Sequence, residues 1–318
     1  MKPDEPNPPL AQPAIRPKSS DDGLPERKVM NRTPLNESAD SQSTRTTPDI
    51  NGSDNEVKLV STYIRFRVLK VLVCEITETQ LVLLILNASA DRKGLIFTYA
   101  TADTIVRANF SSNFQDCIGS ADFCYADGMG VVVAVRSIHG NRIVKVTANN
   151  FFPDILEGII ERGLRVAVIG GTPGVAEAAV INTLKEKGLF RNHPSFLTPL
   201  CRCYSGYFTA SAGKQILQEL STWRPHLVIL GMGQPRQEEW ARIAQESLPG
   251  TTFHCVGGLL DYYSGRISRP PQWMREHGLE WFFRLQDQPS SNWRRYLLGL
   301  PVFLYLVLRE SIKQRRIT

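Results

Sequence analysis

The sequence predicts an α/β fold: a parallel, Rossmann-like sheet with helices on both faces, followed by a basic, partly apolar C-terminal helical appendage. Two observations predict the sheet. Short aliphatic and β-branched runs alternate with helical segments in the second half of the chain, and a glycine-rich turn follows each run. The appendage is predicted by an apolar segment that lies between arginine clusters near the C-terminus. Ligands of such folds bind beyond the carboxyl ends of the strands, where the glycine turns fall.

Residues 1–60 form the first of three predicted regions. Up to residue 57 the chain holds nine of its 20 prolines, no aromatic residue, and seven basic against ten acidic residues. Such a segment cannot bury enough apolar surface to offset its ordering entropy, so we predict that it is disordered. The rest of the chain carries a net charge of +9, which suits an anionic partner such as a nucleotide diphosphate, an anionic lipid or a nucleic acid.

The α/β core is predicted over residues 61–268. Its first half contains runs of β-branched and aliphatic residues, which predict strands, and segments with helical apolar spacing, which predict helices. In chain order these are strands at 68–74, 81–86 and 94–98, a helix at 103–118, an apolar run at 131–136 after a glycine turn, and a helix at 151–162.

The second half of the core repeats a strand, a glycine turn and a helix. The expected elements are strands at 165–169, 226–230 and 252–256, and helices at 175–187 and 236–245. All three glycine turns fall at the carboxyl edge of the predicted sheet, and Gly171 in the first of them is a candidate substrate-binding residue.

Three kinds of feature are missing from the sequence. The first 20 residues hold no apolar stretch typical of a secretory signal, and no run reaches the roughly 18 apolar residues of a membrane span. We therefore expect a cytoplasmic protein. The six cysteines and five histidines lack metal-ligand spacing, so reduced, mostly buried thiols and no metal site are expected.

The C-terminal appendage, residues 269–318, is basic and partly apolar. From residue 281 onward it holds seven basic and two acidic residues, and residues 297–308 are nearly all apolar. This pattern favours an amphipathic element on an anionic membrane surface. The alternative is a C-terminal helix docked on the core with solvated charges around it. The aromatic residues Trp273, Trp281, Phe282, Phe283 and Trp293 suit an interfacial belt or core packing equally well.

Asp127 lies in the sequence ADGMG at 126–130, after a predicted strand. Glycines beside an acid let a ligand approach closely. The Asp127 carboxylate is therefore a candidate general base or ribose ligand. The alternative is a turn in which it caps a backbone N–H group.

The segment GMGQPRQEEW at 231–240 places Pro235 near the start of a helix, whose free N–H groups favour anions. Gln237 in the first turn is placed to bind a uracil, a sugar or a phosphate. Glu238 is equally suited to contact a ligand or to interact, as an acidic side chain, with the N-terminal end of the helix dipole. The segment lacks the third glycine of a dinucleotide fingerprint, and the glycine turn at 170–174 lacks the lysine of a P-loop, so NAD and ATP chemistry lose support.

From about residue 68 to 310 the chain resembles the WecG/TagA/CpsF glycosyltransferases, glycosyltransferase family 26. The matching pieces are modest singly but specific as an ordered set. They are ADGMG at 126–130, GLRVAVIGG at 163–171, GYF at 206–208, PHLVILGMGQPRQEEW at 225–240, VGGLLDYYSG at 256–265, RPPQWMREHGLEWFFRL at 269–285 and RRYLLGLP at 294–301.

The resemblance implies an inverting, metal-independent transfer of a sugar from a nucleotide diphosphate to a polyprenyl-diphosphate-linked acceptor, on a membrane surface. It implies Asp127 as the base, Gln237 as a site glutamine, and Arg284 and Arg294 of the appendage as groups that neutralise the leaving diphosphate. The full set of candidates adds Thr98 as a catalytic residue and, for substrate binding, Thr101, Lys145, Asn150, Gly171, Gln234, Pro235 and Glu238.

The chain departs from the family pattern in three places. Ala100 or Thr101 stands where the family has an asparagine after its threonine. Lys145 and Asn150 replace an arginine and an aspartate, so a bidentate fork and a carboxylate are lost. Ser291 stands where an appendage arginine is expected. These departures leave open a catalytically impaired protein that binds nucleotide sugars or lipid phosphates. Nucleic-acid binding has no motif to support it, and we expect no such partner.

Overall fold

The computed structural model describes residues 63–189, 199–268, 271, 273–274, 280–287, 293 and 297–316. The N-terminal segment predicted to be disordered, residues 1–60, lies outside these residues.

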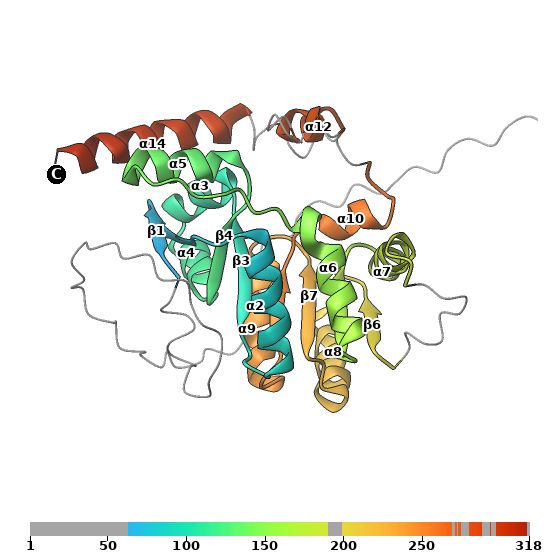
Figure 1. The fold of residues 1–318 in the computed structure, drawn as a ribbon. Helices are drawn as coiled ribbons and strands as arrows, with labels where there is room; N and C mark the ends of the chain where they lie inside the picture. Colours follow the sequence, from blue (N-terminus) through green and yellow to red (C-terminus); the bar gives the residue numbers. More distant parts are fainter. Residues whose placement is uncertain are drawn as a thin grey trace, which may run out of the picture. The chain divides into compact units, whose positions relative to one another are not determined.

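A mostly parallel sheet forms the centre of the core (Figure 1), and within the described residues it has eight strands in the order β1-β2-β4-β3-β8-β7-β5-β6. The strands are β1 (Arg65–Val68), β2 (Val71–Cys74), β3 (Ile96–Ala100), β4 (Phe123–Ala126), β5 (Val166–Gly170), β6 (Cys201–Tyr204), β7 (Leu227–Gly231) and β8 (Thr252–Cys255). Only β1 and β2 pair antiparallel. The predicted α/β fold with a parallel sheet is confirmed.

Helices cover both faces of the sheet. The helices in the described part of the chain are α2 (Glu78–Ala90), α3 (Ala102–Phe110), α4 (Ser112–Gly119), α5 (Met129–His139), α6 (Ala148–Glu161), α7 (Val175–Glu186), α8 (Ala210–Trp223), α9 (Arg236–Ser247), α10 (Leu259–Tyr263), α12 (Glu280–Asp287) and α14 (Gly299–Arg315). Successive residues of one strand point to opposite faces of the sheet: Phe97 of β3 packs in the cluster with α2 and α6, whereas Ile96 packs in the cluster with α8 and α9. Strands buried on both faces explain the continuous apolar runs in the sequence.

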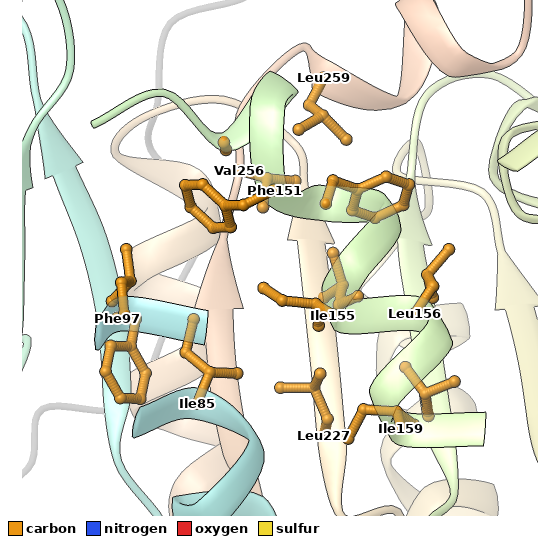
Figure 2. Packing of buried hydrophobic residues seen from close by; sticks show 14 of the residues in the cluster. Ile85, Phe97, Phe151, Ile155, Leu156, Ile159, Leu227, Val256 and Leu259 are labelled. Carbon is orange, nitrogen blue, oxygen red and sulfur yellow. The ribbon is translucent and has the colours of Figure 1, made fainter. Parts of the chain in front are cut away.

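Helix α6 supplies much of the core on one face. Figure 2 shows its side chains Ile155 and Ile159 beside Leu227 of β7 and Phe151 nearer to Val256, at the helical spacing that predicted this element. The same cluster extends through Val256 and Leu259, which Figure 2 places at its end beyond the strands. The core therefore continues up to the edge of the sheet where ligands are expected.

The predicted strand at 81–86 is wrong, because this segment is part of α2. Thr77 begins the helix with a capping box: its side chain accepts from the Gln80 backbone N–H, and the Gln80 side chain accepts from the Thr77 backbone N–H at 3.0 Å. The helix buries Leu81, Leu84 and Ile85, which share one face, but apolar residues on its other face hid this period in the sequence.

The predicted strand at 68–74 and the predicted helix at 103–118 are each two elements. Leu69, in the left-handed region with φ 54°, turns the chain between β1 and β2. Ser111 has an extended backbone with φ −133° and ψ 113°, so it separates α3 from α4. Its hydroxyl accepts from the Phe114 N–H at 3.2 Å and caps the second helix. Apolar spacing continues across the break, so periodicity alone does not locate it.

Other elements agree with the sequence or were not predicted. The strands expected at 94–98, 165–169, 226–230 and 252–256 correspond to β3, β5, β7 and β8, and the apolar run at 131–136 lies inside α5. Strand β6 and helices α8 and α10 were not predicted. All six cysteines are free thiols and four are buried, as expected.

Helix α14 docks on α3 and α5 through one face, which buries Phe303, Leu306 and Val307. Pro301 is tolerated because it lies in the first turn. The docked helix that the sequence left as an alternative is therefore present. Its other face is exposed and apolar, with Leu304, Tyr305, Leu308 and Ile312. None of the helices in the described part of the chain is both long and apolar enough to cross a membrane.

Candidate functional site

A polar cavity of about 240 Å³ lies at the carboxyl ends of β3, β4, β7 and β8. It is lined by Tyr99, Thr101, Asp103, Arg107, Asp127, Thr147, Ala148, Asn149, Gly233, Gln234, Val256, Gly258, Leu259 and Tyr262. Ligands of parallel α/β sheets bind at this edge, because each strand here turns into the loop that precedes a helix. The predicted location of the site is thus the location of the cavity.

Asp127 is the first residue after β4 and lines this cavity. Its backbone N–H donates to the carbonyl of Ala100 at 2.9 Å, so the loop leaves the sheet beside the end of β3. Its Oδ1 accepts from the Thr147 hydroxyl at 3.2 Å. Gly128 follows with φ 98°, a conformation that a side chain would strain, and begins α5. The Asp127 carboxylate is therefore oriented by a neighbour at the cavity wall.

The loop that carries Thr147 reaches Asp127 through a second contact. The Val146 N–H donates to the carbonyl of Ala126 at 2.9 Å, directly before Asp127. Twenty residues separate Thr147 from Asp127 in the sequence, and no local pattern links them. Thr147 was not a predicted site residue for this reason.

Gln234 presents its side chain at the cavity and is held on several sides. Its Oε1 accepts from the Thr104 hydroxyl of α3 at 2.8 Å, and its Nε2 donates to the carbonyl of Tyr99 at 2.8 Å. A longer contact of 3.3 Å joins Nε2 to Glu238 Oε1. The peptide bond between Gln234 and Pro235 is cis. Gln234 thus connects the end of β3, the first turn of α3 and the first turn of α9.

The model of the glycosyl transferase WecG/TagA/CpsF family matches residues 66–317. The chain belongs to this family. It is therefore a glycosyltransferase by family, of the kind that serves the synthesis of cell-surface polysaccharides.

Two predicted residues of this family enzyme, Gln237 and Glu238, lie beneath the cavity and are fully buried. Gln237 Oε1 accepts from the Gly257 N–H at 3.0 Å, and its Nε2 donates to Glu238 Oε1 at 2.8 Å. Thr98 is also fully buried and donates to the same Glu238 oxygen at 2.6 Å. These three side chains join β3, α9 and the turn after β8, and so form the support of the cavity rather than its wall.

The carboxyl group of Glu238 is held in an unusual environment for an acid. Burial raises its pKa, and the hydrogen bonds from Thr98 and Gln237 offset only part of this effect. Within the described residues, its second oxygen, Oε2, has no hydrogen-bond partner. Glu238 lies in the first turn of α9, where the sequence allowed a favourable helix charge, and it is not among the described residues that line the cavity.

The remaining predicted residues of the glycosyltransferase fall in three places. Thr101 lines the cavity, and its hydroxyl caps α3 by accepting from the Thr104 N–H at 3.2 Å. Pro235 lines a neighbouring hollow. The residues Lys145, Asn150 and Gly171 are not among the described residues that line the cavity.

Asn150 and Gly171 have other contacts. Asn150 Nδ2 donates to Glu78 Oε1 at 2.9 Å, so this side chain holds the start of α6 against α2. The carbonyl of Gly171 accepts from the Gly206 N–H at 2.8 Å.

The side chain of Arg284 and all of Arg294 and Ser291 lie outside the described residues. Within the described part, no group of three His, Cys, Asp or Glu side chains could hold a metal ion.

Asp103 and Arg107 were missed by the sequence reading, although both line the cavity. They lie four residues apart on α3, and Arg107 Nη1 is 3.7 Å from Asp103 Oδ2. A signal existed: α3 begins directly after β3, so its first turns must lie at the carboxyl edge of the sheet.

Proposed function

We propose that this family member transfers a sugar from a UDP-linked donor to a polyprenyl-diphosphate-linked acceptor, with inversion and without a metal ion. The transferred sugar would be an N-acetylhexosamine, a hexose or a uronic acid, as in a hexosyltransferase of capsule, teichoic acid or exopolysaccharide synthesis. The observation that carries the proposal is the position of Asp127. This carboxylate lines the cavity at the carboxyl edge of the sheet, and the Thr147 hydroxyl orients it.

The reaction would proceed by a single displacement. Asp127 takes the proton of the attacking acceptor hydroxyl, and the acceptor oxygen forms a bond to the anomeric carbon of the donor sugar. The bond from that carbon to the diphosphate oxygen breaks, and its electron pair leaves with the nucleoside diphosphate. Attack opposite the leaving group inverts the anomeric centre.

The leaving diphosphate needs positive charge, which the appendage supplies in this proposal. Arg284 and Arg294 would bind the diphosphate oxygens, in the place that a metal ion takes in other transferases. Lys145, which replaces a family arginine, would still supply a positive charge for binding the donor. Thr98 would act through Glu238, because it is buried beneath the cavity and donates to that carboxyl group.

The exposed face of α14 supports a peripheral position on the inner face of the cytoplasmic membrane. Leu304, Tyr305 and Leu308 are exposed on this helix, and Arg309 and Lys313 follow on the same segment. The aromatic residues Trp273, Phe282 and Trp293 are also exposed. An apolar face beside basic side chains suits the headgroup region of an anionic membrane.

The test is a transfer assay with a panel of UDP- and GDP-sugars and a polyprenyl-diphosphate-linked acceptor sugar. We expect transfer by the wild-type protein, and a loss of at least about 100-fold in kcat for Asp127→Asn. Asp116→Asn, an exposed change on α4, is the matched control and should behave as wild type. Transfer at the wild-type rate by Asp127→Asn would exclude Asp127 as the base.

The assay also separates catalysis from binding alone. The replacement of a family aspartate by Asn150, which contacts Glu78 on α2, favours the alternative of a nucleotide-sugar or lipid-phosphate binding protein. If the wild-type protein binds UDP but transfers no sugar from any donor, that alternative replaces the proposed activity.

A further inference from the structure

A second hollow, of about 430 Å³, lies beside the Asp127 cavity and differs from it in character. It is lined by Val106, Arg107, Phe110, Ser111, Asn113, Phe114 and Pro235. Four of these side chains are apolar, and Phe110 is exposed over 70% of its surface. A large aromatic side chain exposed in a hollow, next to a polar site, is typical of a surface that binds the apolar part of a ligand.

Arg107 is the residue that lines both hollows. It is also the one cationic side chain among the described residues that line the Asp127 cavity. Its guanidinium lies 4.1 Å from the centre of the Phe114 ring, and its Nη1 donates to the carbonyl of Gln234 at 3.3 Å. These contacts hold Arg107 at the junction, and its side chain remains 41% exposed.

The ion pair of Arg107 with Asp103 does not neutralise this position. The two charged groups are 3.7 Å apart and both are partly exposed, and water weakens the attraction within exposed ion pairs of this kind. The guanidinium therefore keeps N–H groups that can bind a phosphate oxygen.

From these contacts we propose that the second hollow is the subsite for the lipid diphosphate of the acceptor, with Arg107 on the diphosphate and Phe110 beside the first apolar units of the lipid. The molecule presents a polar cavity with a base, then a cation, then an apolar wall. A lipid-diphosphate-linked sugar has the matching order of sugar, diphosphate and lipid. This assignment rests on the proposed function, because only an acceptor of that kind joins a sugar to a lipid through a diphosphate.

The position of the hollow agrees with this occupant. Val106 also packs against the cluster that docks Phe303 and Val307 of α14. The hollow thus begins beside the helix whose exposed apolar face we place on the membrane. A lipid that leaves the hollow on this side would reach the bilayer without crossing the polar cavity.

The test measures binding of three probes to the full-length protein: farnesyl diphosphate, inorganic diphosphate and UDP. Arg107→Gln should weaken farnesyl diphosphate and inorganic diphosphate about tenfold and leave UDP within about twofold. Phe110→Ser should weaken farnesyl diphosphate alone, by about tenfold. Arg162→Gln at the far end of α6 and Ile243→Ser on the exposed side of α9 are the matched controls, and neither should change any probe.

Each outcome has a separate meaning. If Arg107→Gln weakens UDP as much as farnesyl diphosphate, Arg107 belongs to the donor site and the acceptor subsite is excluded. If neither variant changes farnesyl diphosphate binding, the second hollow is not the lipid subsite, whatever the transfer assay shows. If the wild-type protein transfers no sugar but binds farnesyl diphosphate in an Arg107-dependent way, the proposed activity fails and the lipid-diphosphate subsite stands.

Discussion

Thr98 Oγ1 donates a 2.6 Å hydrogen bond to Glu238 Oε1, which joins the central strand β3 to the first turn of α9 beneath the cavity. Both side chains are fully buried, and 140 residues separate them in the sequence. The same Glu238 oxygen also contacts Gln234 Nε2 at 3.3 Å, so the bond supports the loop that carries Gln234 to the cavity.

Thr98→Val keeps the shape of the side chain but removes the hydroxyl donor. A buried acceptor that loses its partner costs about 1–3 kcal/mol, so we expect the free energy of unfolding to fall by that amount. Chemical denaturation measures it. Thr98→Ser, which keeps the hydroxyl, is the control and should recover most of the loss. Equal stability of Thr98→Val and wild type would show that the bond does not stabilise the fold.

Glu238 should make stability depend on pH, because its pKa in the folded protein lies above the ordinary value of 4.5. Ionisation then favours the unfolded chain. The contribution of Glu238 is complete below about pH 4.5 and is lost as the pH rises through the folded pKa. Glu238→Gln has no such titration, so its free energy of unfolding should fall less than that of wild type over this range.

The pH dependence is measured by denaturation at a series of pH values above 4.5. Glu186→Gln, exposed on α7, is the matched control and should follow wild type. Parallel curves for wild type and Glu238→Gln would contradict an elevated pKa of the buried carboxyl group.

Thr147→Val should impair catalysis while keeping nearly the same side-chain shape at the cavity wall. The hydroxyl of Thr147 donates to Asp127 Oδ1 at 3.2 Å, and its loss removes one of the contacts that orient the carboxylate. Loss of one orienting hydrogen bond to a charged group corresponds to about tenfold in kcat/KM. Thr147→Ser should restore the rate. A Thr147→Val enzyme as fast as wild type would show that Asp127 does not need this partner.

The two faces of α14 should respond differently to polar substitution. Leu308→Ser changes the exposed face, so it should reduce sedimentation with anionic vesicles and leave the unfolding free energy within about 0.5 kcal/mol. Phe303→Ser changes the docked face and should cost about 3–5 kcal/mol. Val133→Ser, exposed on α5, is the control for vesicle binding. Unchanged sedimentation of Leu308→Ser would argue against membrane contact through this face.

The sequence was sufficient to predict an element where its apolar pattern matches the way in which the element is buried. Strands β5 and β7 are buried on both faces of the sheet, so their residues form apolar runs that end at glycine turns. The prediction of a strand at 81–86 was wrong because this apolar run belongs to a helix. Apolar residues on more than one face of that helix conceal its helical period. Asp127 was recognisable because Gly128, whose positive φ the turn requires, directly follows it in the chain.

The sequence by itself determined the α/β class, the family resemblance and the candidacy of Asp127. Only the tertiary structure decided which of two glutamines in the same motif lines the cavity. Gln234 does so, whereas Gln237 is buried against Gly257. Gln234 precedes α9 and is held by Tyr99 and Thr104, whereas Gln237 lies in the first turn of α9 and is held by Gly257 in the turn after β8. These partners are all distant in the sequence. Arg107 joined the site for the same reason, since the packing of α3 against the Gln234 loop places it there.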